Sequence, residues 1–136
     1  MSYAVAASLQ RAIFARLAGE AEIIEIVGPN IYDAVPAGTE PEVFVLIGEE
    51  AVRDRSTKTS DGAHHDFTVS VFADQHGFAG SKALAAIICD CLLGSDLMLD
   101  RGRVTGVWFR RARTRRGRAP DRRRIDLQFR AHVEDI

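Results

Sequence analysis

The chain has 136 residues, of which 46% are hydrophobic and 27% are charged, a composition that excludes an intrinsically disordered or fibrous protein and fits one domain over residues 1–136. No apolar run reaches the roughly 18–20 residues of a membrane helix, and the N-terminus lacks the basic start and apolar stretch of a secretory signal, so we expect synthesis in the cytoplasm. The net charge of −1 hides two opposite parts: residues 1–100 carry six Lys/Arg and fifteen Asp/Glu, a balance of −9, whereas residues 101–136 carry twelve Arg and four acids, a balance of +8. Charge segregated in this way usually reports on a partner or on assembly rather than on fold.

Two helices are expected at the start of the chain. Apolar residues recur every three or four positions in residues 3–17, which predicts an amphipathic helix ended by Gly19. A shorter apolar segment, residues 21–27, closes at the turn residues 28–30 and is expected to be a second helix. Residues 31–36 then look extended, because the proline at their end pushes the preceding residue out of the helical region.

Two strands that pair as a hairpin are predicted next. Residues 42–48 are β-branched and aromatic on both faces, which is typical of a strand in the middle of a sheet. Residues 49–64 have no periodic apolar face, and we expect an exposed loop there. Residues 66–73 alternate between apolar and polar side chains, which predicts a half-buried strand paired with residues 42–49. The apolar face of this strand consists of Phe67, Val69, Val71 and Ala73.

A third helix is predicted from the glycine-containing segment 77–81 to Gly94. Its buried stripe consists of Leu84, Ile87, Ile88, Cys91 and Leu92. Cys89 and Cys91 are two positions apart in this helical pattern, so their side chains point about 200° apart and cannot easily close a disulfide. We expect both to be small core thiols in a reducing compartment.

A long hairpin of residues 104–112 and 125–133 is predicted at the end of the chain, with turn residues at Gly117 and Pro120-Asp121. Its second strand alternates along its whole length. The inward residues are expected to be Ile125, Leu127, Phe129, Ala131 and Val133, and the outward ones Asp126, Gln128, Arg130 and His132. The order of elements predicts an α+β fold: a mostly antiparallel sheet with a long C-terminal hairpin, and helices packed on the sheet.

Residue patterns that support catalysis or cofactor binding do not stand out. The glycines of residues 77–81 lack the lysine and the spacing of a phosphate-binding loop. His64, His65 and His76 could be imagined as metal ligands, but adjacent residues of a strand point to opposite faces. No serine lies in a nucleophile elbow or beside a positioned His–acid pair. We therefore predict that the protein is not an enzyme and has no catalytic, cofactor-binding or metal-binding residue.

Nine arginines and one acid lie between Arg110 and Arg124, and three interpretations of this segment remain open. The charges could form a solvated hairpin tip that protects a sheet edge from aggregation. They could neutralise the phosphates of a nucleic acid without reading its bases. They could instead meet acidic surface, including the acidic part of a neighbouring copy in a head-to-tail ring.

Trp108 lies just before this segment. If Val107 and Phe109 face the core, strand alternation turns Trp108 outward, toward a helix or an interface, although burial in the core is the commoner fate of a lone tryptophan. The candidates for an interface or for a DNA-facing lumen are Trp108, Arg110, Arg111, Arg113, Arg115, Arg116, Arg118, Arg122, Arg123 and Arg124.

Five short segments, in matching order over nearly the whole chain, show a family resemblance. They are Ala7–Ile13, Ile31–Pro36, Leu46–Glu49, the Gly77 start of the third helix and Phe129–Ala131. In these segments the chain resembles the tail terminator proteins, which are tail-completion components of long-tailed phages and of gene transfer agents. The most distinctive motif is Tyr-Asp-x-x-Pro in residues 32–36.

The resemblance implies a structural role without catalysis. Members of this family form a six-fold ring that caps the finished tail tube, ends its polymerisation and offers its opposite face to head-completion proteins of the neck. The implied partners are further copies of the chain in a hexameric ring, the tail tube protein and a head-completion (stopper) protein, with transient passage of double-stranded DNA and no membrane. The implied location is the cytoplasm during assembly and then the tail–neck region of the particle. The density of arginine in the hairpin is where the sequence departs from the family.

A tail terminator is thus the first hypothesis, with residues 110–124 near the lumen or an axial face of the ring. The alternative is a small, sequence-nonspecific nucleic-acid-binding protein that uses the basic hairpin. The acidic first hundred residues argue against the alternative, because a dedicated binder normally spreads positive charge over a face.

Overall fold

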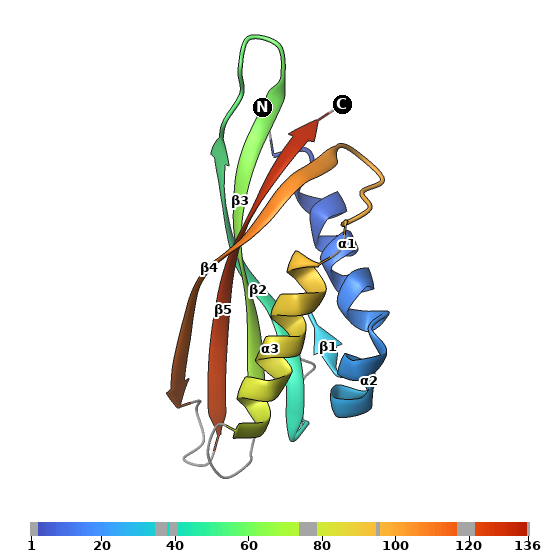
Figure 1. The fold of residues 1–136 in the computed structure, drawn as a ribbon, viewed down its shortest axis with the longest axis vertical. Coiled ribbons are helices and arrows are strands. Elements are labelled where there is room, and N and C mark those ends of the chain that lie inside the picture. The colour runs from blue at the N-terminus through green and yellow to red at the C-terminus, as the bar shows by residue number, and fades with distance from the viewer. Residues whose placement is uncertain are drawn as a thin grey trace.

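Three helices cover one face of a five-stranded sheet in the part of the chain that the computed structural model describes, which comprises residues 3–34, 38, 41–73, 79–94, 96–116 and 122–135 (Figure 1). The predicted α+β class, the mostly antiparallel sheet and the long C-terminal hairpin are confirmed. Predictions that concern residues 35–36, 76–78 and 117–121, among them His76 and Arg118, lie outside the described residues.

The helices end where the sequence predicts. They are α1 (Ala6–Ala18), α2 (Ala21–Val27) and α3 (Ala79–Leu93). The N–H of Gly19 donates to the carbonyl of Ala15 at 3.0 Å and closes α1. Gly28 follows α2 with a φ of 58°, a left-handed conformation that glycine adopts without steric cost. None of these described helices combines the length and the apolar character needed to cross a bilayer.

The strands form one sheet in the order β1-β2-β3-β5-β4. They are β1 (Ile31–Tyr32), β2 (Val43–Asp54), β3 (Asp61–Ala73), β4 (Arg103–Arg116) and β5 (Arg123–Asp135). β1 runs parallel to β2, and the other neighbours are antiparallel. β4 is therefore an edge strand, which among the described strands pairs only with β5.

The core lies between the helices and the inner face of the sheet. All the predicted inward residues of β3 and β5 are at most 4% exposed, so both alternation patterns are confirmed. The helices contribute the fully or almost fully buried side chains Leu9, Ile13, Leu17, Leu84, Ile88 and Leu92. Cys91 is buried and Cys89 half-buried against this core, both are free thiols, and burial raises the pKa of each.

The exposed loop predicted for residues 49–64 is confined to residues 55–60, and the rest of the prediction is wrong. β2 continues to Asp54 and β3 begins at Asp61, so the two strands form a hairpin that projects past the helices (Figure 1). A β-bulge between Ile47 and Glu50 shifts the alternation of β2 by one residue. The inward positions of this part of the hairpin are occupied by the small Ala63, the polar His65 and the half-buried Val52, so the sequence shows no periodic apolar face although these residues pack against the core.

The strands of the C-terminal hairpin are also longer than predicted. β4 extends to Arg116 and β5 begins at Arg123, so the described candidate arginines other than Arg122 lie within paired strands. The backbone of the paired strands fixes the positions of their side chains, which a loop would leave free.

Truncation of Phe129 tests the position of the core. This side chain is fully buried between the ring of Phe67, with centroids 5.5 Å apart, and the ring of Phe109, 6.0 Å away. We expect Phe129→Ala to lower the free energy of unfolding by about 3–5 kcal/mol, because the substitution removes these contacts and leaves a cavity. Phe14→Ala, at a side chain 42% exposed, is the control and should change it by about 0.5 kcal/mol or less. Urea unfolding curves that shift equally for the two variants would contradict this core.

Candidate interaction surface

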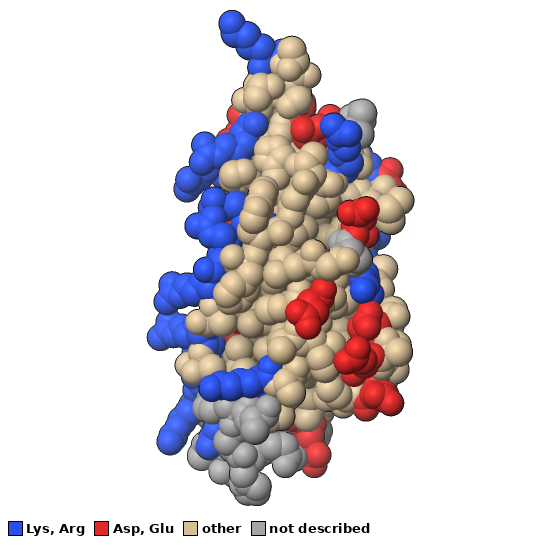
Figure 2. Space-filling view, viewed as in Figure 1, with Lys and Arg blue, Asp and Glu red and all other residues tan. Residues whose placement is uncertain are grey.

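The outer edge of β4 is exposed at every residue from Trp108 to Arg116, and we refer to these residues as the arginine edge. Because β4 pairs only with β5 among the described strands, its other side presents free backbone N–H and C=O groups. Figure 2 shows Lys and Arg side chains along the left side of the molecule, where β4 lies, and Asp and Glu side chains over the helices on the right. The segregation of charge along the sequence is thus also a segregation in space.

Two β-bulges decide which side chains of β4 face away from the helices. One extra residue enters the strand at Thr105 and another at Arg110. Side chains alternate along a strand, so an unbroken β4 with Trp108 outward would turn the odd-numbered arginines toward the helices. The bulge at Arg110 instead brings Arg113 opposite Asp126, an outward residue of β5. The odd-numbered arginines therefore lie on the outer face of the sheet.

The carboxylate of Asp126 binds arginines from both strands of the hairpin. Its Oδ2 accepts a hydrogen bond from Nε of Arg115 at 3.0 Å, and its Oδ1 accepts one from Nε of Arg124 at 2.6 Å. The hydroxyl of Ser70 in β3 donates to the same Oδ1 at 2.6 Å. Arg115 and Arg124 are directly opposite each other in the ladder, where like charges destabilise a sheet. Asp126 compensates this repulsion.

The surroundings of Asp126 lower the pKa of its carboxyl below the ordinary value. Burial acts in the opposite direction, but the hydrogen bonds from Ser70 and Arg124, together with the positive charges of Arg124 and Arg115, outweigh it. Asp126 is therefore ionised at neutral pH.

A second ion pair lies on the same face, between β3 and β5. Arg130 donates from Nε to Oδ1 of Asp66 at 2.7 Å and from Nη2 to Oδ2 at 3.1 Å, which is a bidentate arrangement. The hydrogen bond from Arg130 lowers the pKa of Asp66, and the charge of Arg110 contributes to the same shift. The charge of Arg110 therefore favours the ionised form of Asp66 in the neighbouring strand.

Two of the candidate arginines lie over aromatic rings. The guanidinium of Arg124 is 4.8 Å from the ring centroid of Phe72, and that of Arg122 is 5.4 Å from the ring centroid of Phe44. Arg122 also donates to the backbone carbonyls of residues 41–42, both at 3.1 Å, and is only 7% exposed. The structure thus places Arg122 inside the fold, whereas the sequence suggested a position that faces a partner.

The candidate arginines therefore fall into two groups. Arg111, Arg113 and Arg116 are exposed and form no ion pair with any residue in the described part of the chain. The others are paired, at least half-buried or close to a carboxylate of the sheet: Arg110, Arg115, Arg122, Arg123 and Arg124. Charge available to a partner is concentrated in the first group.

Trp108 is 49% exposed on the outer face, so burial in the core, the commoner fate of a lone tryptophan, is wrong here, and the outward orientation that strand alternation offered as the alternative is found. Its indole covers Gly106, where a Cβ would come within 3.0 Å of the ring. The ring of His64 lies edge-on to it at 6.3 Å. Phe109 is 45% exposed although its ring meets Phe129, because β4 is an edge strand with no neighbour on its other side.

The two adjacent histidines of β3 face opposite sides of the sheet, as strand alternation predicts. His65 is fully buried, with its Nδ1 3.3 Å from the carboxylate of Glu50. The ring of His64 lies 5.1 Å from that of His132 on the outer face; burial lowers the pKa of His64, and the charge of Arg130 adds to the shift. Within the described residues, no three His, Cys, Asp or Glu side chains are arranged to hold a metal ion.

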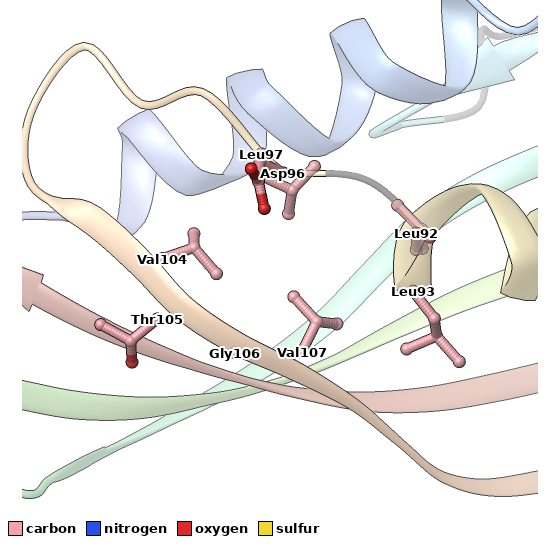
Figure 3. A pocket seen from close by; sticks show the side chains of 9 residues that line it. Leu92, Leu93, Asp96, Leu97, Val104, Thr105, Gly106 and Val107 are labelled. Atoms are coloured by element: carbon pink, nitrogen blue, oxygen red, sulfur yellow. The ribbon is translucent and has the colours of Figure 1, made fainter.

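A hollow of about 250 Å³ lies between the end of α3 and β4 (Figure 3). Leu92 and Leu93 border it from α3, and Val104 and Val107 border it from β4. Asp96 contributes a carboxylate, and none of the described lining residues is a histidine, cysteine, lysine or arginine. The lining offers apolar contacts and few groups for proton transfer or phosphate binding.

Two comparisons with known proteins give a match. A family model described as tail completion protein gp17 matches residues 11–134. A chain in the solved structure of the virion of a native gene transfer agent particle is 51% identical to this chain, and the match covers 98% of this chain and 99% of that one with a TM-score of 0.91. None of the curated proteins compared with the chain matches it.

Replacement of Asp126 tests the charge network of the outer face. We expect Asp126→Asn to lower the free energy of unfolding at pH 7 by about 1–3 kcal/mol, because two guanidinium groups lose their carboxylate. The folded-state pKa of Asp126 is lowered, so its contribution is complete above the unfolded value of about 3.9 and is lost as the pH falls through the folded value. Urea unfolding of wild type and of Asp126→Asn from pH 7 to pH 2 measures the difference in their free energies of unfolding. We expect this difference to become smaller at the acid end.

The control for this comparison is Asp90→Asn, at an exposed carboxylate of α3. It should leave the free energy of unfolding within about 0.5 kcal/mol of wild type at pH 7. Equal losses for both variants would mean that Asp126 does not stabilise the hairpin through its ion pairs.

Proposed function

Because this chain belongs to the tail completion protein gp17 family, we propose that it is the tail terminator of a gene-transfer-agent or phage-like particle. In this role, copies of the chain form a ring, most simply a hexamer, that caps the finished tail tube and ends its polymerisation. The opposite face of the ring is the docking surface for head-completion proteins of the neck. Residues 1–136 act as one tail-terminator domain, and the role is structural rather than catalytic.

The observation that carries this proposal is the likeness to a chain of a gene transfer agent virion over nearly the whole length of both chains. At this level of identity and coverage, the two chains share the same arrangement of strands and helices. A role in completing the tail also suits a chain whose distinctive surface is an exposed strand edge and not a cleft with reactive groups.

Exposed arginines that are not used in contacts between copies suit a ring through which DNA passes. Arg111, Arg113 and Arg116 offer positive charge on long side chains that nothing else in the described residues holds. Such side chains neutralise phosphates without reading bases, so any contact with DNA would be weak and independent of sequence. Assembly would take place in the cytoplasm, before the protein becomes part of the tail–neck region.

Removal of the protein from its particle tests the proposal. We expect particles that lack this chain to show tails of uncontrolled length, or tails and heads that are not joined, in negative-stain images. Purified protein mixed with tube protein should bind tube ends and stop elongation, with light scattering that reaches a plateau earlier than that of tube protein alone. Because such a ring can close on the tube only, the mixture and not the isolated protein is the decisive sample. Tubes that elongate equally with and without the protein would overturn the proposal.

The exposed arginines also favour a second candidate, a sequence-nonspecific nucleic-acid-binding protein. This candidate predicts an affinity for double-stranded DNA that falls steeply with salt and is lost in the variant Arg111→Gln/Arg113→Gln/Arg116→Gln. Titration of labelled DNA with each protein at several salt concentrations measures the salt dependence and the loss of affinity in the variant. A wild-type protein that does not bind, or a variant that binds equally well, would exclude it.

A further inference from the structure

The two lateral sides of the molecule are complementary in charge. β4 forms one side, and α2 lies on the opposite side; in the view of Figure 1 the arginine-rich half of β4 and α2 both lie in the lower half of the molecule. Figure 2 shows the same sides as basic and acidic, respectively. A copy shifted sideways would therefore bring the basic side of one molecule to the acidic side of the next.

The basic side combines charge with apolar surface. Arg111, Arg113 and Arg116 form no ion pair with a described residue, so their charges remain available. Trp108 and Phe109 are half-exposed next to them, at 49% and 45%. Exposed aromatic side chains beside arginines are the combination that protein interfaces favour over other surface.

The acidic side has the matching combination on α2. Ile23 and Val27 of this helix are buried in the core, but Ile24 and Ile26 are 45% and 44% exposed. Glu22 and Glu25 lie among them, both exposed, and neither forms an ion pair with a described residue. A short helix that leaves two isoleucines in water beside two uncompensated carboxylates is better satisfied when a basic, aromatic surface covers it.

We propose that the arginine edge of β4 in one copy binds α2 of the next copy, so that this contact joins neighbouring subunits of the ring. The inference rests on the proposed function, because it assigns the surfaces through which the terminator closes. The contact is heterologous: each copy uses its basic side once and its acidic side once, as a closed ring requires. The half-exposed isoleucines of α2 become covered by the edge, and the arginines that lie opposite α2 receive carboxylate partners; α2, about 10 Å long, spans part of the edge.

A second copy fits this surface better than DNA does. The part of the chain before residue 101 carries a charge of −9 and would repel phosphates close to it, whereas the same charge attracts the arginine edge of another copy. A DNA duplex would also offer no apolar surface that covers Trp108 and Phe109. The bulge at Arg110 supports the assignment for Arg111 and Arg113, since it turns these two side chains away from the helices of their own chain, whereas Arg116 alternates to the other face of the exposed strand.

An exchange of charge between the two sides tests the contact. We expect Arg113→Glu/Arg116→Glu and, separately, Glu22→Arg/Glu25→Arg to reduce the fraction of capped tube ends by about tenfold or more, because like charges then meet across the interface. The protein that carries all four substitutions should recover most of the capping, since the attraction is restored with reversed sign. Arg113→Lys/Arg116→Lys is the matched control and should cap as wild type does. Negative-stain counts of capped ends, in mixtures with tube protein, provide the measurement.

Three results would overturn the contact while the proposed function stands. The first is normal capping by both charge-reversed proteins; the second is loss of capping that the four-fold variant does not recover. The third is normal capping by Arg113→Glu/Arg116→Glu in particles that fail to deliver DNA, which would assign the arginines to the genome. Failure of the wild-type protein to cap tube ends would overturn the proposed function itself, and so the two failures are distinguishable.

Cross-linking on capped tubes tests the same contact without charge reversal. In a Cys89→Ala/Cys91→Ala background, the pair Glu25→Cys and Arg113→Cys in one chain should give a ladder of covalent oligomers with a short bismaleimide. The control pair Glu25→Cys and Thr59→Cys, which uses the exposed end of the β2–β3 hairpin, should remain monomeric. Capped tubes without a ladder for the first pair, or with equal ladders for both, would contradict the assignment.

Discussion

Repulsion between arginines on paired strands is the constraint on which the C-terminal half of this protein depends. Arg115 faces Arg124 across the ladder, and such a pair of like charges destabilises a sheet unless it is compensated. Asp126 compensates these two arginines on the outer face, with Ser70 as a further donor to its carboxylate. The pairing of β4 with β5 then extends through the arginines, and the charges become part of a stiff strand.

The resulting edge strand carries its charges in a defined direction. The bulge at Arg110 shifts the alternation of β4 so that Arg111 and Arg113 lie on the outer face, beside the polar residues of β5. Trp108 lies on the same face over Gly106. A long, flat strand edge is a risk for uncontrolled pairing with other chains, and the row of charges limits that risk while leaving the edge accessible to a chosen partner.

Segregated charge suits the proposed role, in which copies of the chain assemble with one another and with a few neighbours. Positive charge on β4 and negative charge over the helices give each copy a direction, which favours one lateral arrangement over its reverse. In the proposed ring, a few arginines that form no ion pair within the described part of the chain suffice for this directionality. The remaining arginines stabilise the sheet through Asp126, Asp66 and the rings of Phe44 and Phe72.

The sequence by itself determined the helices, the α+β class, the inward faces of β3 and β5 and the resemblance to tail terminators, because each follows from local periodicity or from short motifs. It did not reveal that β2 and β3 continue past the helices, since strands with no apolar face lack the alternation by which a strand is recognised. It also did not reveal the bulges, or that Arg122 would be buried against Phe44 and the carbonyls of residues 41–42. These features depend on contacts between segments far apart in the chain. Only the tertiary structure decided which arginines are used within the sheet and which remain for a partner, because that choice depends on where Asp126, Asp66 and the aromatic rings lie.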